Sequence, residues 1–284
     1  MEIVNPGNVL PFYKNTIISR NKLAKHRHKP SAGEFNWAIP VNMGESLSFQ
    51  VPTTPAWFGY TTFYLLDENE DILDTISSGY LPFSQDADDN AWFTYVGNSP
   101  ELNSLDCGLY SIMLENSETG EFLYSEDFRV MNLSGKKNAY SLEFYHESEV
   151  DGILYQLGLQ QKIWLLDAVF DTPEIVQPTE SLTDGNAVEV LTFQSVQRRE
   201  VLKFPYFPDF WQGTLHRIRM LSNVTITSMQ SGNIYEIAGL GIDLTSEDQD
   251  IVFKKGVLSW ISTTQTMNVC GDDRSLTVIN QIPV

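Results

Sequence analysis

The side chains of this chain that are best suited to acid–base chemistry are four histidines, and their neighbours predict no catalytic group. His26 and His28 stand two positions apart, but Arg27 between them and the surrounding lysines would repel a metal cation. His146 stands beside two acidic residues and His216 beside an arginine, and neither lies in a recognisable nucleophile motif. We therefore interpret all four as structural or solvent-exposed side chains.

The two cysteines, Cys107 and Cys270, are too few for a disulfide framework and too far apart for metal-ligand spacing, so both are interpreted as core thiols. The sequence also contains no Gly-x-Gly-x-x-Gly, Walker loop, Gly-x-Ser-x-Gly or Cys-x-x-Cys. Acid pairs for glycoside hydrolysis cannot be chosen among 37 carboxylates without geometry. We expect no catalytic residue, no cofactor and no enzyme activity.

Two acidic segments have the composition of cation-binding loops. Residues 67–72 match the opening of a calcium loop, but Ile72 replaces the glycine needed at position six and Ser78 the glutamate needed at position twelve. We interpret this segment as a charged hairpin tip. Residues 86–90 place four oxygen-bearing side chains in five positions and are the better candidate for a hard cation. Solvated surface is the interpretation favoured there, and we assign no metal site.

Charge is distributed unevenly along the chain. The formal net charge is −19, from 18 basic and 37 acidic residues. Residues 1–35 carry six basic and two acidic residues, whereas residues 36–128 carry sixteen acidic residues and no lysine or arginine. Because phosphate contacts need clustered basic side chains, we expect no direct sequence-specific binding of nucleic acid.

The basic segment has two main interpretations, a solvated tail or a contact with the acidic face of a second copy of the chain, and a contact with nucleic acid is a third. In the second interpretation, the arm contributes Lys14, Arg20, Lys22, Lys25, Arg27 and Lys29. The acidic face contributes Asp67, Glu68, Glu70, Asp71, Asp86, Asp88 and Asp89. The segment lacks a clean periodicity, so we predict an extended N-terminal arm over residues 1–40.

Short runs of β-forming residues bounded by turn residues predict an all-β fold with two β-sandwich-like domains. Residues 41–132 fit a small immunoglobulin-like sandwich. In such domains a tyrosine of the penultimate strand often braces a corner, and Tyr110 is the residue of this chain in that strand. Residues 133–138 are polar and turn-rich and mark a boundary, and a second antiparallel domain follows over 139–284. We also predict a long polar loop at 171–187 and one short helix within 207–218.

Several segments resemble virion structural proteins of Bacteroidetes phages, especially crAss-like phages, and of related prophage tail regions. They are residues 164–174, 215–226 and 257–270, together with Gly108-Leu109-Tyr110 and residues 124–130. The resemblance implies a β-rich component of a neck, collar or tail ring, made in the host cytoplasm and contacting copies of itself and other virion proteins. No catalytic residue carries over from it.

The N-terminus shows no basic stretch followed by an apolar run, and no uncharged apolar run reaches about 18 residues, so we expect a soluble protein without membrane contact. The main alternative function is an adhesion or carbohydrate-binding module. It would be favoured by Tyr206, Phe207 and Trp211 on one exposed flat face. A hydrolase would need a cleft that holds His146 or His216 against a nucleophile.

Overall fold

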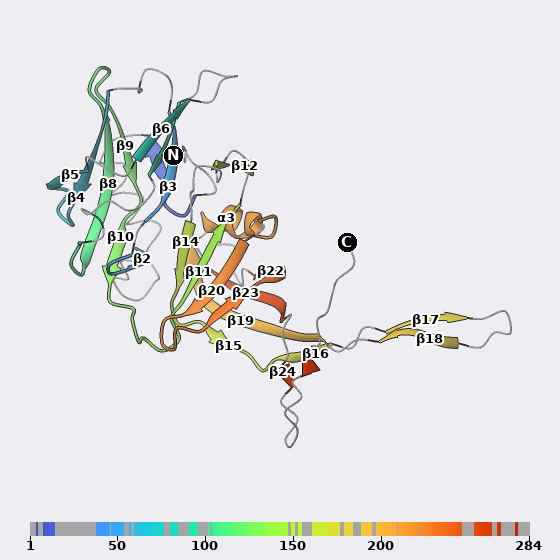
Figure 1. Cartoon of the computed structure of the whole chain (residues 1–284). Helices are drawn as coiled ribbons and strands as arrows, with labels where there is room; N and C mark the ends of the chain where they lie inside the picture. Colours follow the sequence, from blue (N-terminus) through green and yellow to red (C-terminus); the bar gives the residue numbers. More distant parts are fainter. Residues whose placement is uncertain are drawn as a thin grey trace.

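The computed structural model is an all-β protein with one α-helix among the described residues (Figure 1). It describes residues 4, 8–14, 38–45, 47–53, 57, 60–76, 80–84, 91–95, 102, 104–146, 149–150, 153–154, 161–176, 179–183, 189–194, 197–208, 210–221, 223–245, 253–262, 266–267 and 276–277.

The strands before residue 132 form two sheets that pack face to face. They are β1 (Phe12–Lys14), β2 (Ile39–Asn42), β3 (Phe49–Thr53), β4 (Thr61–Leu66), β5 (Ile72–Ile76), β6 (Tyr80–Ser84), β7 (Ala91–Tyr95), β8 (Gly108–Asn116), β9 (Glu121–Ser125) and β10 (Phe128–Met131). One sheet has the order β3-β7-β6. In the other, β8 lies between β4 on one side and β9 and β10 on the other, and β5 extends it beyond β4. This strand order is that of an immunoglobulin-type sandwich, as predicted.

Alternating apolar residues explain why these two sheets pack together. Phe49 of β3 lies 4.9 Å from Phe12 and 6.2 Å from Phe63 of β4, measured between ring centroids, and all three side chains are fully buried. The hairpin between β8 and β9 turns at Gly120, whose φ of 66° lies in the left-handed region that glycine tolerates best. The backbone N–H of Gly120 donates a hydrogen bond to the carbonyl of Asn116 at 2.8 Å, which closes this hairpin.

Tyr110 at the start of β8 forms the predicted corner. Its hydroxyl donates a hydrogen bond to the backbone carbonyl of Asp106, four residues upstream, at 3.1 Å. Burial, together with the nearby Asp106 carboxylate, raises the pKa of the Tyr110 hydroxyl. The hydroxyl therefore stays protonated and fixes the loop that leads into β8.

Removal of this hydroxyl has a moderate expected cost. Tyr110→Phe keeps the ring contact with Phe128, whose centroid lies 6.0 Å away, but loses the hydrogen bond. We expect a loss of about 0.5–1.5 kcal/mol in the free energy of unfolding, measured by urea denaturation. The exposed Tyr60 provides the control, since Tyr60→Phe should change stability by less than about 0.5 kcal/mol. Equal losses in the two variants would contradict the corner.

The strands after residue 139 form a second pair of packed sheets and three separate two-stranded sheets. They are β11 (Tyr140–Tyr145), β12 (Glu149–Val150), β13 (Ile153–Leu154), β14 (Gln161–Leu165), β15 (Val169–Phe170), β16 (Glu174–Val176), β17 (Thr179–Thr183), β18 (Glu189–Gln194), β19 (Gln197–Pro208), β20 (Asn223–Ser228), β21 (Ile234–Glu236), β22 (Ala238–Thr245), β23 (Phe253–Ser262), β24 (Thr266–Met267) and β25 (Leu276–Thr277). One sheet has the order β14-β11-β20-β21, and the other β15-β19-β23-β22, with β16 also paired to β19.

Aromatic side chains join these two sheets. Phe170 of β15 lies 5.3 Å from Tyr140 of β11 and 5.7 Å from Trp260 of β23, between ring centroids. The predicted short helix is confirmed as α3 (Trp211–Ile218), which buries Trp211, Thr214, Leu215 and Ile218. The predicted loop at 171–187 is wrong for residues 174–176 and 179–183, because these residues pair as strands with β19 and β18.

The N-terminal segment is built into the fold at both of its described ends. β1 pairs antiparallel with β9, and β2 pairs parallel with β10. Val9, Leu10 and Phe12 are fully buried. The expectation of an extended arm over 1–40 is therefore wrong for residues 8–14 and 38–40, because their apolar side chains gain more by burial than they would in a solvated tail.

One hydrophobic core runs through both halves of the chain. The same buried cluster contains side chains of β3 and β8 from the first half and of β14, β19 and α3 from the second. Leu133, within the predicted boundary segment, is also fully buried. The sheets are separate, but the cores of the two predicted domains are continuous.

Candidate functional site

Lys14 and the acidic turn at residues 67–71 lie at opposite edges of one sheet of the first half. Its strand order along this path is β1-β9-β8-β4-β5. Lys14 is exposed at the end of β1, at one edge. The acidic turn that leads into β5 lies at the other edge, about 19 Å away at the usual strand spacing of about 4.8 Å. A single copy therefore does not bring the two groups together.

The acidic turn is a well-formed hairpin tip. Asp67 accepts hydrogen bonds at its Oδ1 atom from the backbone N–H groups of Asn69, at 2.8 Å, and Asp71, at 2.9 Å. Glu70 has a φ of 68°, which closes the turn. The carboxylates of Glu68 and Asp71 remain exposed to solvent. The predicted hairpin tip is confirmed. Two of its four acidic side chains are exposed, and the other two are half-buried.

β5 itself is a candidate contact surface that the sequence analysis missed. Its only strand partner in the described part of the chain is β4. Ile72 and Leu73 are 56% and 51% exposed, and Asp74 beside them is exposed as well. An edge strand offers unpaired backbone groups, so this edge combines hydrogen-bonding capacity, apolar area and negative charge. The adjacent apolar residues Ile72 and Leu73, directly after a turn, were the available signal.

Most of the predicted contact residues lie outside the described residues. On the basic side these are Arg20, Lys22, Lys25, Arg27 and Lys29, and on the acidic side Asp86, Asp88 and Asp89. The structure therefore places only Lys14 and the turn at residues 67–71 of the two predicted groups.

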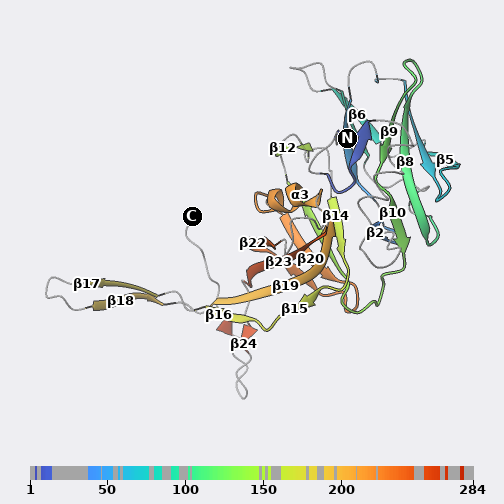
Figure 2. The same cartoon turned by 180° about the vertical axis from the view of Figure 1, so that it is seen from behind.

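The hairpin formed by β17 and β18 stands away from the rest of the molecule (Figures 1 and 2). Within the described residues, these two strands pair only with each other. An isolated two-stranded hairpin is marginally stable in water. Next to its base, β16 carries Ile175, which is 70% exposed. The hairpin and its base are therefore a second candidate contact surface.

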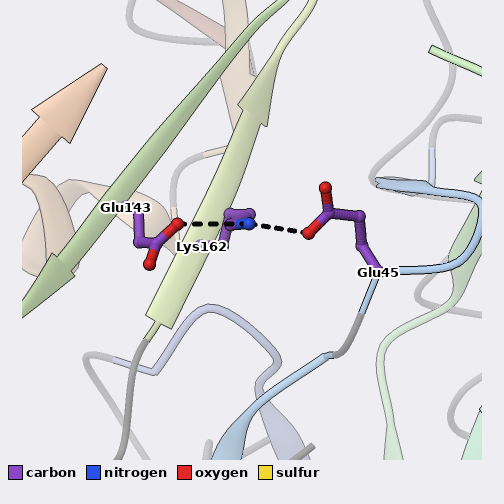
Figure 3. Close-up of polar contacts among 3 residues, drawn as sticks. All are labelled: Glu45, Glu143 and Lys162. Carbon is purple, nitrogen blue, oxygen red and sulfur yellow. Dashed lines mark hydrogen bonds and ion pairs between the residues drawn. The ribbon is translucent and has the colours of Figure 1, made fainter. Parts of the chain in front are cut away.

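A lysine and two glutamates clasp the two halves of the chain together (Figure 3). The Nζ atom of Lys162 in β14 lies 2.7 Å from Oε2 of Glu45, after β2, and 3.2 Å from Oε2 of Glu143 in β11. Burial alone would lower the pKa of Lys162, but the hydrogen bonds and charges of the two glutamates outweigh it and raise the pKa. The clasp therefore holds a charged ammonium group between the halves.

Lys162→Met tests this clasp. At pH 7 we expect the variant to be less stable by about 0.5–1 kcal/mol, because all three side chains are partly exposed to solvent. Since the folded protein raises the pKa of Lys162, this contribution is complete below the unfolded pKa of about 10.4 and is lost as pH rises through the folded value. The difference from the wild type, measured by urea denaturation, should shrink above about pH 10. Lys136→Met, at an exposed position, should show neither effect.

The described side chains with catalytic or sugar-stacking capacity form no exposed site. His216 is exposed on the last turn of α3, and His146 is half-buried after β11. Each of the four tryptophans whose side chains are described is buried: Trp57, Trp164, Trp211 and Trp260. The cysteine prediction is wrong for Cys107, which lies exposed in the turn before β8, and Cys270 lies outside the described residues.

Within the described part of the chain, no group of three or more histidine, cysteine, aspartate or glutamate side chains is placed to hold a metal ion. None of the helices described there combines the length and apolar character needed to cross a bilayer.

Comparison with known proteins gives no family for this chain: no protein-family model matches it, and no curated protein matches it.

Proposed function

We propose that this chain is a non-enzymatic structural subunit of a phage virion, which forms a homo-oligomeric ring in the neck, collar or tail. In this proposal, the edge of one copy that carries the basic segment meets the acidic β5 edge of the next copy. Other virion proteins contact the ring, and the assembled particle is the place where the chain functions. The sequence resemblance to phage virion proteins supports the identity of the particle.

The observation that carries the proposal is that Lys14 and the acidic turn at residues 67–71 lie at opposite edges of one sheet. A head-to-tail contact joins two different patches, and it closes into a ring when the rotation between copies allows. In the proposal, Lys14 at the β1 edge and the exposed Glu68 and Asp71 at the β5 edge belong to the two different patches. A two-fold symmetric contact uses the same patch on both copies, so it would not need a basic and an acidic group at two different edges.

The exposed apolar groups support the same proposal. Ile72 and Leu73 on β5 and Ile175 on β16 each expose at least half of their surface. Burial of such side chains against a neighbouring copy contributes about 25 cal/mol per Å². The projecting β17–β18 hairpin would gain a partner in the same way.

The carbohydrate-binding alternative is weaker because its proposed platform is not exposed. Trp211 and Phe207 are 1% and 0% exposed, and the indole Nε1 atom of Trp211 donates a hydrogen bond to the carbonyl of Val9. The side chain of Tyr206 lies outside the described residues. The position and hydrogen bond of Trp211 are those of a core residue.

Light scattering of the purified chain tests the proposal. We expect an assembly several times the 32.2 kDa monomer mass at low ionic strength and dissociation in high salt. Neutralising the acidic edge with Glu68→Gln, Asp71→Asn and Asp74→Asn should lower the average mass of the assembly at low salt. Lys136→Gln with Lys137→Gln is the matched control, because both lysines are exposed and belong to neither edge. A monomer under all conditions, or an assembly unaffected by the acidic-edge variant, would contradict the proposal.

A further inference from the structure

The N-terminal segment, residues 8–14, fills a slot formed by both halves of the chain. Its apolar side chains Val9, Leu10 and Phe12 are fully buried. The ring of Phe12 packs 4.9 Å from that of Phe49, between centroids. Most of its contacts belong to elements far away in the sequence, which is the relation that a bound peptide has to its receptor.

Directed hydrogen bonds hold this N-terminal segment in place. The Oδ1 atom of Asn8 accepts from the backbone N–H of Gln50 at 3.0 Å and from Nε2 of Gln161 at 2.9 Å. The carbonyl of Val9 accepts from Nε1 of Trp211 at 2.8 Å. Strand β1 adds a ladder to the edge of β9. Backbone pairing along a sheet edge, with pockets for alternate side chains, is the usual physics of peptide recognition by strand addition.

The connection that follows the N-terminal segment is much longer than its path within one copy requires. Lys14 pairs with Leu123 and Ile39 pairs with Phe128, so the two ends lie five positions apart along one continuous edge. Five positions of a strand correspond to about 17 Å. The 25 residue steps from Lys14 to Ile39 can reach about 80 Å when extended. The connection can therefore deliver the segment to the slot of an adjacent copy.

We propose that residues 8–14 of one copy occupy the slot of the next copy in the ring. This inference rests on the proposed function and names the element that links the subunits. The contacts are the same within one chain and between two, so exchange sacrifices no packing. The connection also carries five basic residues, Arg20, Lys22, Lys25, Arg27 and Lys29, which exchange would bring near an acidic neighbour.

Cross-linking within the full-length chain tests the exchange. Lys14→Cys and Leu123→Cys place two thiols at directly paired positions of β1 and β9. They are introduced together into a background with Cys107→Ser and Cys270→Ser, oxidised in the assembled state and analysed under denaturing, non-reducing conditions. We expect most of the cross-linked protein to run as covalent multimers. Thr62→Cys with Glu115→Cys, a paired position of β4 and β8, should give monomers only.

A second probe avoids the buried Leu123 in case its variant fails to fold. Replacing the exposed Lys14 with p-benzoylphenylalanine leaves the core intact, and irradiation of the assembly should join position 14 of one chain to residues 121–125 of a separate chain, identified by mass spectrometry of the linked peptides. Links confined within single chains would overturn the exchange. Light scattering on the same samples then separates the two proposals: assembled rings with internal links overturn only the exchange, whereas monomers with internal links overturn both.

Discussion

Phe12→Ala should lower the free energy of unfolding by about 3–5 kcal/mol, as expected for truncating a fully buried phenylalanine. Phe12 contacts Phe49 and belongs to the cluster that runs through both halves of the chain, so the cavity has little freedom to collapse. Urea denaturation measures the loss.

Lys14→Ala is the matched control for Phe12→Ala, since Lys14 lies two positions away on the same strand with its side chain exposed. It should change stability by less than about 0.5 kcal/mol. A Phe12→Ala variant as stable as this control would show that β1 does not occupy its slot. The same packing implies that removing residues 1–35 unfolds the protein and does not simply detach a tail.

Gly256→Ala should be the second strongly destabilising substitution. Gly256 of β23 pairs with Phe204 of β19, and the phenyl ring lies over the glycine. A Cβ atom added at Gly256 would lie 2.0 Å from Cζ of Phe204, which no real contact allows. Phe204 is 2% exposed and its ring packs 5.7 Å from that of Phe207, between centroids, so moving the ring would disturb the core. We expect a loss of about 1–3 kcal/mol or more, measured by urea denaturation.

Two comparisons identify the clash as the cause. Gly213 lies on α3 with nothing within 4 Å of an added Cβ, so Gly213→Ala should stabilise the protein by about 0.5–1 kcal/mol. Adding Phe204→Leu to Gly256→Ala should cost less than the sum of the two single substitutions, because the smaller side chain relieves the overlap. Additive losses would contradict the explanation.

The local elements of the fold could be predicted from the sequence where turn chemistry is strong. Gly120 takes the positive φ angle that its hairpin requires, and the tip at residues 67–71 is stabilised by the Asp67 side chain. The immunoglobulin-type order of the first sheets followed from the strand spacing and Tyr110. These signals act over a few residues, so they can be read without the rest of the chain.

Long-range contacts could not be predicted in this way. The burial of Val9 and Phe12 depends on Trp211, Gln161 and β9, which lie far along the chain. The basic residues that follow this segment led to the prediction of an extended arm over the whole N-terminal region, although the apolar residues of the segment form part of the core. The exposed edge of β5 was missed for a similar reason, since exposure depends on which strands lie beside it.

The parallel pairing of β2 with β10 determines how the protein should respond to tension. Ile39 begins β2 beside Phe128, whereas Met131 ends β10 beside Asn42. A pull that enters at Ile39 and leaves at Met131 therefore acts at opposite ends of the ladder and slides the two strands past each other. Their hydrogen bonds then share the load and must break together instead of opening one by one, so this joint should resist stretching far better than a hairpin pulled open from its free ends.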